Sequence, residues 1–368
     1  MILNKLSVMN YKNIRQAEIV CSTKTNCFFG NNGVGKTNLL DAIYYLSFCK
    51  SLRNTVDSQV IYRGEEICVL QGIYDFEGKD EEIFCSIRPG LRKQFKHNKK
   101  DYDKLSEHIG LLPIVTVSPS DSDLISGGSD ERRRFIDMII SQHDKNYLNA
   151  LIQYNKALTQ RNVLLREKKR DKTLFEAIDI QMAIYGKPVF EKRKSFIDTI
   201  IPVFEQYYKD ISNAPEKIGL KYISQLENID FEKVLKESFE KDMLLGYTST
   251  GVHKDELEMT LDRQLMRKIG SQGQNKTFLI ALKLAQFAFL ASKASTQPIL
   301  LLDDIFDKLD SERVEKIIHL VSGDLFGQIF ITDTNRKYLD RILEAIGKDY
   351  SLFRVEQGNV ELMENKTN

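Results

Sequence analysis

The sequence lacks the features that would place it among membrane, secreted or repeat proteins. None of its 368 residues belongs to an apolar run long enough to cross a bilayer. The first residues, Met1–Lys5, lack the apolar core and cleavage site of a signal peptide, so we expect a cytoplasmic protein. No internal repeat or low-complexity segment interrupts the chain, whose length suits one large domain or two ordinary ones.

Cysteine is scarce, and its arrangement argues against disulfides. The five cysteines are odd in number, fall in the first quarter of the chain and form no C-x-x-C pair: Cys21, Cys27, Cys49, Cys68 and Cys85. We therefore predict buried free thiols in a reducing compartment.

Net charge is also nearly absent, at +1, but the charges are unevenly distributed. Residues 131–194 carry +7 and residues 91–104 carry +4, which leaves −10 for the rest of the chain. A protein that is neutral overall can thus present a basic surface to nucleic acid. The alternative is that helices simply carry solvated Lys and Arg, and for a single run such as Arg166–Arg170 this alternative is favoured.

The most informative segment that is present is a glycine loop. Its residues, Gly30-Asn31-Asn32-Gly33-Val34-Gly35-Lys36-Thr37, fit the phosphate-binding pattern G-x-x-x-x-G-K-[ST]. A short apolar stretch precedes the loop, and residues 38–46 after it have a helical apolar face. Backbone N–H groups and a helix N-terminus can surround phosphates there, Lys36 can reach the β- and γ-phosphates, and Thr37 can bind Mg²⁺.

Two later segments suit the same chemistry. Asp303 follows the apolar run Ile299–Leu302, a pattern that in phosphate-loop ATPases supplies a carboxylate to Mg²⁺. Asp304 is then a candidate to polarise the attacking water, the alternative being a loop cap or an ion pair. Ser271–Gln274 opens a helix and is a second candidate anion site, although serine and glycine are common at helix starts.

The periodicities predict a mixed fold with a helical insertion. Strands are expected over residues 3–8, 17–21, 67–74, 83–87, 113–119, 257–261, 298–304 and 328–332, and helices over residues 274–293, 311–320 and 336–346. Residues 130–212 are expected to be helical, with a break or kink at Gly186 and Pro188. A stripe within this region, Leu148, Leu151, Asn155, Leu158, Asn162 and Leu165, is expected to face a helical subdomain.

These motifs fall in the order found in ABC-type ATPases, and the chain as a whole resembles the RecF family, DNA-repair relatives of the SMC and Rad50 ATPases. The stretches that carry the resemblance extend from the first strand to about Asn335: residues 10–13, 30–45, 50–53, 118–121, 132–137, 251–255, 271–277 and 299–310. The resemblance implies an α/β fold: a P-loop ABC-type ATPase head with a β-rich lobe and an inserted helical lobe. The expected boundaries are 1–129 and 216–368 for the two parts of the ATPase domain, and 130–215 for the inserted lobe.

The resemblance also implies roles for individual residues. The ATP-binding set is Lys12, Asn13, Gly30, Asn31, Asn32, Gly33, Val34, Gly35, Lys36, Thr37, Asn38, Ser271, Gln272, Gly273 and Gln274, of which the last four contact the γ-phosphate of ATP held by a second subunit. Thr37 and Asp303 are expected to bind Mg²⁺, and Asp304 and Lys36 to be catalytic. The dimer seam is expected to be lined by the loop Asp307–Asp310, which contributes the acids Asp307 and Asp310. Lys254 and Lys276 stand where the family often has Arg, and Asp333-Thr334 stands where many ABC ATPases have a switch His.

The implied function is that of a weak, DNA-stimulated ATPase that dimerises around ATP. It would bind duplex DNA and junctions with single-stranded gaps, and would work with RecR and RecO to help load RecA. Candidate DNA contacts in the basic segments are Arg132, Arg133, Lys168, Lys169 and Arg170.

Three alternatives make different demands on the chain. An SMC- or Rad50-type ATPase needs longer helical arms, and an OLD-type nuclease needs an additional acidic domain after the ATPase. A clamp that uses ATP as a structural ligand without turnover is not distinguished by the sequence.

Overall fold

The strand before the glycine loop, β3 (Thr25–Phe29), lies inside a six-stranded sheet of order β15-β14-β3-β13-β12-β8. The structure is a computed structural model that describes residues 1–53, 56–212, 215–227, 229–307, 309–347 and 349–366. The other strands of this sheet are β8 (Ile114–Val117), β12 (Ile299–Asp303), β13 (Ile329–Asp333), β14 (Tyr350–Glu356) and β15 (Asn359–Lys366). All neighbours are parallel except β14 and β15. Strands β12 and β13 are buried along their whole length, as parallel sheets require.

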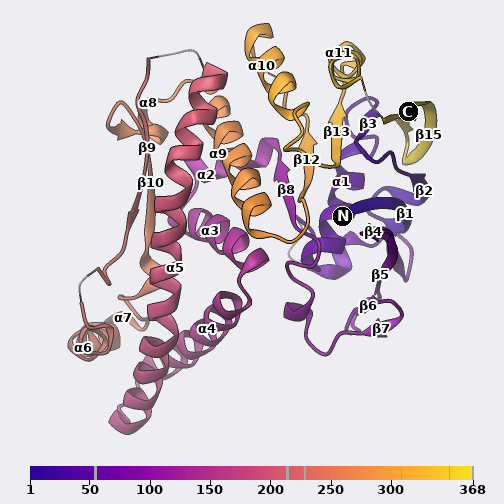
Figure 1. Cartoon of the computed structure of the whole chain (residues 1–368). Coiled ribbons are helices and arrows are strands. Elements are labelled where there is room, and N and C mark those ends of the chain that lie inside the picture. The colour runs from indigo at the N-terminus through magenta and orange to yellow at the C-terminus, as the bar shows by residue number, and fades with distance from the viewer. Residues whose placement is uncertain (54–55, 213–214, 228, 308, 348, 367–368) are drawn as a thin grey trace. The chain divides into compact units, whose positions relative to one another are not determined.

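A second six-stranded sheet is antiparallel and has the order β2-β1-β4-β5-β6-β7. Its strands are β1 (Ile2–Tyr11), β2 (Ile14–Val20), β4 (Cys68–Phe76), β5 (Lys79–Ile87), β6 (Gln94–His97) and β7 (Lys100–Asp101). Helix α1 (Lys36–Phe48) contacts strands of both sheets, and nearly all its residues are buried (Figure 1). The helix that carries Lys36 and Thr37 is therefore held from two sides.

The chain divides into two compact units by internal contacts. Unit 1 consists of Met1–Asp121, Asp210–Ser212 and Lys276–Asn368, and contains both six-stranded sheets. Helices of unit 1 include α10 (Ser311–Val321), α11 (Arg336–Ile346) and most of α9 (Gln272–Lys293). The expected lobe boundaries at residues 130 and 215 differ from these limits and stay a prediction.

Unit 2 consists of Ser122–Lys209 and Asn213–Asn275. It combines a three-stranded sheet of order β11-β10-β9 with seven helices in the described residues. The strands are β9 (Ile218–Ile223), β10 (Glu256–Leu261) and β11 (Gln264–Leu265). The helices are α2 (Asp123–Ser126), α3 (Ser129–His143), α4 (Lys145–Arg166), α5 (Lys172–Ser212), α6 (Phe231–Glu237), α7 (Phe239–Leu245) and α8 (Met266–Ile269).

Two expectations about the helical region are wrong. Helix α5 is continuous through Pro188 and Pro202, so the expected break at Gly186 and Pro188 is wrong, whereas a kink there stays a prediction. A Cβ at Gly186 would lie 2.6 Å from the Phe231 ring, so this glycine permits close packing instead. In α4, the buried face is centred on Tyr147, Tyr154 and Arg161, whereas most of the expected stripe is half-buried or exposed.

The cysteines are free, as expected, and four of the five are buried. Burial raises the pKa of Cys49 to about 12, which keeps this thiol protonated and unreactive at neutral pH. Within the described residues, no helix is both long and apolar enough to span a bilayer.

Candidate nucleotide-binding site

The glycine loop connects β3 to α1 in unit 1. A left-handed backbone is required at Gly35, where φ is 119°, and a Cβ there would lie 2.9 Å from the Asn13 carbonyl oxygen Oδ1. The Lys36 ammonium folds back over the loop and donates to the carbonyl oxygens of Gly30 at 2.8 Å and Asn31 at 3.0 Å. The positive charge is thus held at the loop, where a phosphate would need it.

Asn13 and Asn38 brace the loop from the side. Asn13 donates from Nδ2 to the carbonyl oxygen of Gly33 at 3.1 Å, and Asn38 donates to Asn13 Oδ1 at 2.7 Å. Lys12, by contrast, forms an ion pair with Asp41 of α1 at 2.6 Å, and both side chains are largely buried. Its ammonium is committed to α1 in this structure, so its contact with nucleotide stays a prediction.

The predicted Mg²⁺ ligands lie side by side. Thr37 donates from Oγ1 to Asp303 Oδ1 at 2.8 Å, although the two residues are 266 positions apart. Thr332 also donates to Asp303 Oδ1, at 2.7 Å, because β12 and β13 pair Asp303 with Thr332. A hydroxyl and a carboxylate oxygen next to a phosphate-binding loop are the donor types that Mg²⁺ prefers, so these residues fit the ion.

Asp304 adjoins this pair in a left-handed conformation, with φ of 47°. Its backbone N–H donates to the Thr332 carbonyl oxygen at 3.2 Å. Burial, followed by the negative charge of Asp303, raises the pKa of the Asp304 carboxyl, and the nearby Lys36 opposes the shift. The structure thus brings Lys36, Thr37, Asp303 and Asp304 together at the carboxyl ends of neighbouring parallel strands.

Ser271–Gln274 lies in unit 2 and forms a reciprocal cap at the start of α9. Gln274 donates from its backbone N–H to Ser271 Oγ at 3.2 Å, and Ser271 donates from its backbone N–H to Gln274 Oε1 at 2.8 Å. Ser271 and Gln272 are exposed, and Gly273 is half-buried. These residues are accessible to a second molecule, and their pairing with ATP across a dimer stays a prediction.

The predicted seam residues make local contacts in unit 1. The carbonyl oxygen of Asp307 accepts a hydrogen bond from the Lys276 ammonium, and Asp310 caps α10 by accepting from the Arg313 N–H at 2.9 Å. Lys308, which belongs to the same predicted loop, lies outside the described residues.

The predicted DNA-binding arginines of α3 are used inside unit 2. Arg132 is 5% exposed and forms two hydrogen bonds with the Glu256 carboxylate, at 2.6 and 2.8 Å. Arg133 donates to the Asp255 carbonyl oxygen at 2.7 Å. Burial and the pairing with Glu256 assign Arg132 to the interior rather than to a DNA-binding surface, which corrects the expectation for this residue.

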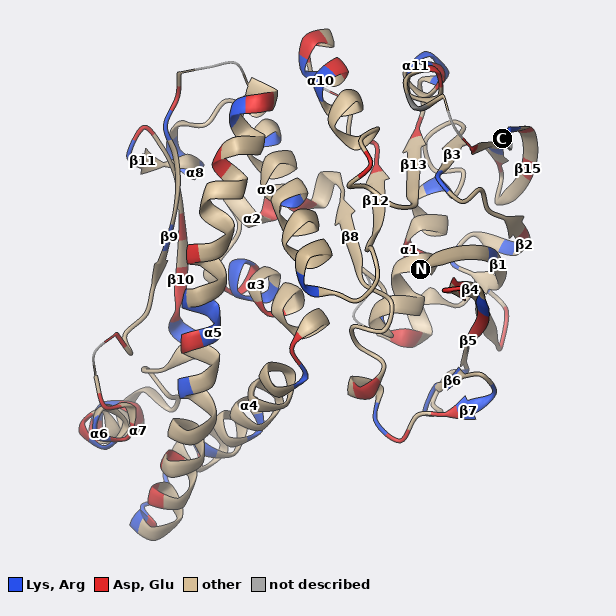
Figure 2. Ribbon diagram, viewed as in Figure 1, with Lys and Arg blue, Asp and Glu red and all other residues tan. Residues whose placement is uncertain are grey.

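The α4–α5 turn is exposed, but two of its three predicted cations are paired. Lys169 pairs with Glu167 at 2.6 Å, and Arg170 pairs with Glu240 at 3.3 Å. Lys168 makes no ion pair among the described residues. Figure 2 shows a second group of Lys and Arg at the β6–β7 hairpin of unit 1, where Lys99 and Lys100 are exposed.

Arg53 and Asp41 are residues of the site whose roles the motifs did not supply. Arg53 NH2 lies 3.4 Å from Asp303 Oδ2, the carboxylate oxygen that Thr37 does not contact. Asp41 accepts from the Leu52 N–H at 2.7 Å and from Ser51 Oγ at 2.8 Å, which fixes the turn that carries Arg53. The sequence offered one signal for Asp41: it is the one acid among the mostly apolar residues of α1.

Comparison with known proteins identifies a family with a structure solved in complex with ATP, in agreement with the geometry of the site. The profile of the RecF/RecN/SMC N-terminal domain matches residues 2–359. The chain is 65% identical to the DNA replication and repair protein RecF of Parabacteroides distasonis, over 99% of this chain and 100% of that protein. The chain belongs to the RecF family. The RecF of Bacteroides fragilis strain YCH46 is 56% identical over the full length of both chains.

Solved structures agree with this family. The structure of the recombination mediator RecF with ATP, from the RecFOR pathway, has a TM-score of 0.88 and 28% identity, and the match covers 99% of this chain and 98% of that one. An Smc head domain from Pyrococcus furiosus has a TM-score of 0.59 at 17% identity, covering 100% of this chain and 96% of that one, and shows a shared fold only. The RecF resemblance and the ABC-ATPase-like α/β fold expected from the sequence are therefore confirmed.

Proposed function

We propose that this RecF-family chain binds ATP with Mg²⁺ in unit 1 and hydrolyses it slowly, with turnover stimulated by DNA. The observation that carries the proposal is the 2.8 Å contact between Thr37 and Asp303, next to the Lys36 ammonium and the glycine loop. This contact, together with the ATP complex of a RecF of closely similar fold, supports a nucleotide site at the glycine loop.

Each residue of the site has a separate task. Lys36 and the N–H groups of the loop bind and orient phosphate oxygens, and Thr37 and Asp303 hold Mg²⁺. Bound Mg²⁺ neutralises phosphate charge and so lowers the barrier to attack. Asp304 orients the attacking water and accepts its proton.

On DNA, we propose the role of a recombination mediator. The chain would bind duplex DNA and junctions with single-stranded gaps as an ATP-dependent homodimer, and would help RecR and RecO to load RecA. The support is the identity to RecF proteins and the RecFOR pathway named for the structural relatives. Its working compartment would be the cytoplasm, where the chromosome lies.

Phosphate release by the wild type and Lys36→Ala, measured with and without gapped duplex DNA, tests the proposal. We expect slow release that rises with DNA in the wild type and falls to background in Lys36→Ala, because the variant loses the charge nearest the γ-phosphate. ATP binding should fall in parallel.

A nucleotide-gated clamp without turnover is the alternative, and family membership does not favour it. Such a clamp would bind ATP in a Lys36-dependent way but release no phosphate above the Lys36→Ala background. The same assay therefore separates the two functions.

A further inference from the structure

Unit 2 contains a groove that the nucleotide site does not use. One wall is the C-terminal part of α4, with Thr159, Asn162 and Arg166. The other wall is the end of α7 and the residues that follow, Leu245–Tyr247. The groove has a volume of about 500 Å³, enough for several side chains of a partner molecule.

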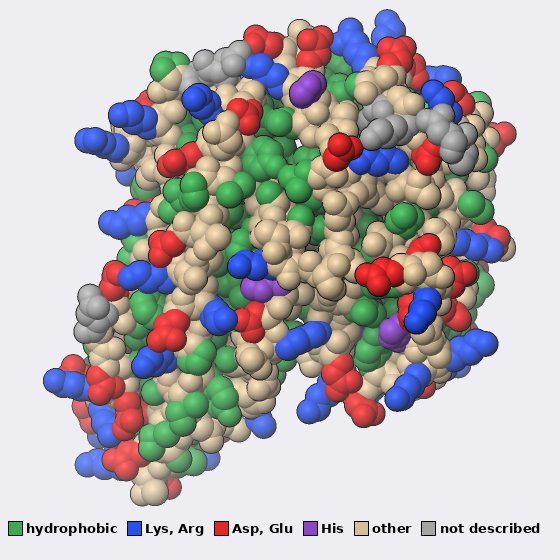
Figure 3. Space-filling view, in the orientation of Figure 1, with side chains coloured by type: hydrophobic (Ala, Val, Ile, Leu, Met, Phe, Trp, Pro, Cys, Tyr) green, Lys and Arg blue, Asp and Glu red, His purple; other side chains and the backbone are tan. Residues whose placement is uncertain are grey.

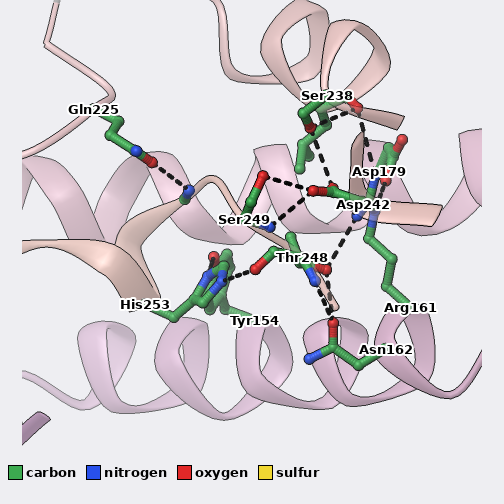
Figure 4. Close-up of polar contacts among 12 residues, drawn as sticks. Tyr154, Arg161, Asn162, Asp179, Gln225, Ser238, Asp242, Thr248, Ser249 and His253 are labelled. Atoms are coloured by element: carbon green, nitrogen blue, oxygen red, sulfur yellow. Dashed lines mark hydrogen bonds and ion pairs between the residues drawn. The ribbon is translucent and has the colours of Figure 1, made fainter. Parts of the chain in front are cut away.

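The segment that follows this wall is held rigidly in place (Figure 4). Thr248 donates from both its backbone N–H and its Oγ1 to Asn162 Oδ1, each at 2.8 Å. Ser249 donates from its N–H and Oγ to Asp242 Oδ1, at 3.0 and 2.6 Å. His253 contacts the Thr248 carbonyl oxygen at 3.0 Å and Tyr154 Oη at 2.7 Å. The wall is therefore preorganised, which lowers the entropic cost of binding.

The anchor of this segment is a buried ion cluster. Arg161 bonds to Asp179 at 2.7 Å and to Asp242 at 2.6 Å, and its side chain is fully buried. Buried ion pairs add little stability over apolar packing, and are better suited to fixing one arrangement of the chain. Here the arrangement that they fix is the position of residues 242–249 against α4, which forms the groove.

The groove presents hydrogen-bond donors. Within the described part of the chain, Asn162 Nδ2 makes no hydrogen bond, and Figure 4 shows it without a partner. The exposed Arg166 uses only Nε, in a bond to the Asn162 carbonyl oxygen at 3.2 Å. Lys254 Nζ lies 4.9 Å from the centre of the half-exposed Tyr247 ring. Glu167, which follows Arg166 in the sequence, and Glu240 of α7 pair with Lys169 and Arg170, and the other acid of α7, Asp242, pairs with Arg161.

Apolar side chains extend this donor surface. Leu245, which lines the groove, is 43% exposed; the adjacent Leu244 lies outside the lining and is 90% exposed, the highest value among the large apolar residues in the described part of the chain. Tyrosine and arginine, next to apolar side chains, are the residue types enriched at the energetic centres of protein interfaces. A nucleic acid would use the cations and the tyrosine ring, but it would offer no apolar side chain to Leu245.

We propose that this groove binds an acidic segment of a partner protein that carries an apolar side chain beside its carboxylates. The Arg166 guanidinium and the Asn162 amide donate to a carboxylate, Lys254 adds positive charge, and Leu245 with Tyr247 contacts the apolar side chain. Nucleotide turnover plays no part in this interaction, so its failure would leave the ATPase proposal intact.

The chain contains no tryptophan, which allows a direct test. Tyr247→Trp in the full chain places a single reporter at the groove. The probes are a blocked synthetic peptide of glutamate and leucine, the same peptide with glutamine for glutamate, and a thymidine oligonucleotide. We expect the glutamate peptide to change the tryptophan emission in a saturable way. The Kd of the glutamine peptide should be higher by about tenfold or more, since charge-assisted hydrogen bonds are stronger than neutral ones.

Three further substitutions in this background complete the test. Arg166→Glu and Leu245→Asp should each raise the Kd of the glutamate peptide by about tenfold, through charge repulsion. Ile184→Asp is the matched control, because Ile184 is 60% exposed on α5 and does not line the groove. Figure 3 shows that exposed apolar side chains also lie among charged ones elsewhere on the surface. ATP hydrolysis should be equal in all these proteins.

Three results would overturn the proposal. The first is the absence of glutamate-peptide binding, and the second is peptide binding that Arg166→Glu leaves unchanged. The third is Arg166-dependent binding of the oligonucleotide that is tighter than binding of the peptide, which would make the groove a single-strand site.

Discussion

At the scale of single residues, Asp303 is the centre of the nucleotide site. It accepts from Thr37 and Thr332 through one carboxylate oxygen and lies 3.4 Å from the Arg53 guanidinium through the other. Both oxygens are thus oriented by neighbours, and Mg²⁺ would meet a carboxylate that is already in position. Within the described residues, no comparable set of donors surrounds the Asp304 carboxylate. Its oxygens are therefore available to orient a water molecule and accept its proton.

We predict that Asp304→Asn binds ATP as the wild type does and releases phosphate about 100-fold more slowly, since a positioned base contributes at least that factor. The amide keeps the shape of the side chain but cannot accept the proton. ATP affinity by filter binding and single-turnover phosphate release measure the two effects separately. Hydrolysis at the wild-type rate would show that Asp304 is not the catalytic acid–base group.

A second residue-scale prediction concerns His253. Burial lowers the pKa of this imidazole to about 4, below its ordinary value of about 6.5. The unfolded chain therefore binds more protons than the folded one between these values, and the free energy of unfolding falls as pH drops through this window. From pH 7 to pH 5 the loss from this group is about 2 kcal/mol.

Urea unfolding of wild type and His253→Gln at the two pH values isolates the contribution. The variant lacks the titrating group, so its free energy of unfolding should fall by about 2 kcal/mol less than that of the wild type. Equal losses in both proteins would show that His253 is not held neutral in the folded chain.

Sequence patterns predict the role of a residue most directly where the chemistry is local. Gly30–Thr37 is one continuous segment, and its role follows from its own order of residues. The burial of Arg161 and of Arg132, which was expected to contact DNA, was not foreseen because the burial of a charge depends on partners far along the chain. Arg161 is paired with Asp242, 81 positions away, and Arg132 with Glu256, 124 positions away. No periodicity records such pairings.

At the scale of elements, the same distinction holds. The expected hairpin between residues 67 and 87 is present as β4 and β5, because its alternating pattern and its turn are both local. Strand β9 was not predicted; it lies at the edge of its sheet and pairs with β10 over six residues, a long-range pairing that local patterns do not record. The break expected from Pro188 is absent from α5 because a long helix packed along its length tolerates the loss of single hydrogen bonds.

The β6–β7 hairpin yields a prediction about DNA. Lys99 and Lys100 are exposed at its turn, whereas Lys169 and Arg170 of the α4–α5 turn are already paired with acids. We therefore expect Lys99→Glu with Lys100→Glu to weaken duplex binding in every sequence. The slope of log K against log salt should become less negative by about 0.9 for each phosphate that the variant no longer neutralises.

The matched control is Lys169→Glu with Arg170→Glu, which changes the net charge by the same amount. Its effect on affinity at moderate salt should be smaller, because those cations are partly neutralised in the folded chain. Fluorescence anisotropy over a salt series measures both variants. A larger loss of affinity in the control would move the DNA contact to the α4–α5 turn, and a flat salt dependence of the wild type would mean that neither basic segment binds phosphates.

At the scale of the whole molecule, the length of the helices distinguishes this protein from related ATPases that carry long coiled-coil arms. Helix α5 has 41 residues and α4 has 22, and both belong mainly to compact unit 2. At 1.5 Å per residue, α5 extends for roughly 60 Å, which is far too short for an arm of many heptads.

The last prediction is a dimer that depends on the γ-phosphate. The glycine loop belongs to unit 1, and the exposed Ser271 cap belongs to unit 2. If the Ser271 segment of one copy binds the γ-phosphate held by the loop of another, ATP bridges two copies and ADP does not. The monomer–dimer equilibrium then shifts by the free energy of one phosphate contact.

Sedimentation of the wild type with ATP, with ADP and without nucleotide should show dimers with ATP and mainly monomers otherwise. Ser271→Arg places a bulky side chain where the phosphate would bind, so it should keep ATP binding by the monomer but lose both dimerisation and turnover. Ser195→Arg, at an exposed serine of α5 in the same unit, adds the same side chain away from the cap and should behave as the wild type. An equal dimer fraction in all three nucleotide states, or a Ser271→Arg protein that still dimerises on ATP, would instead indicate an ATPase whose site is complete within one chain.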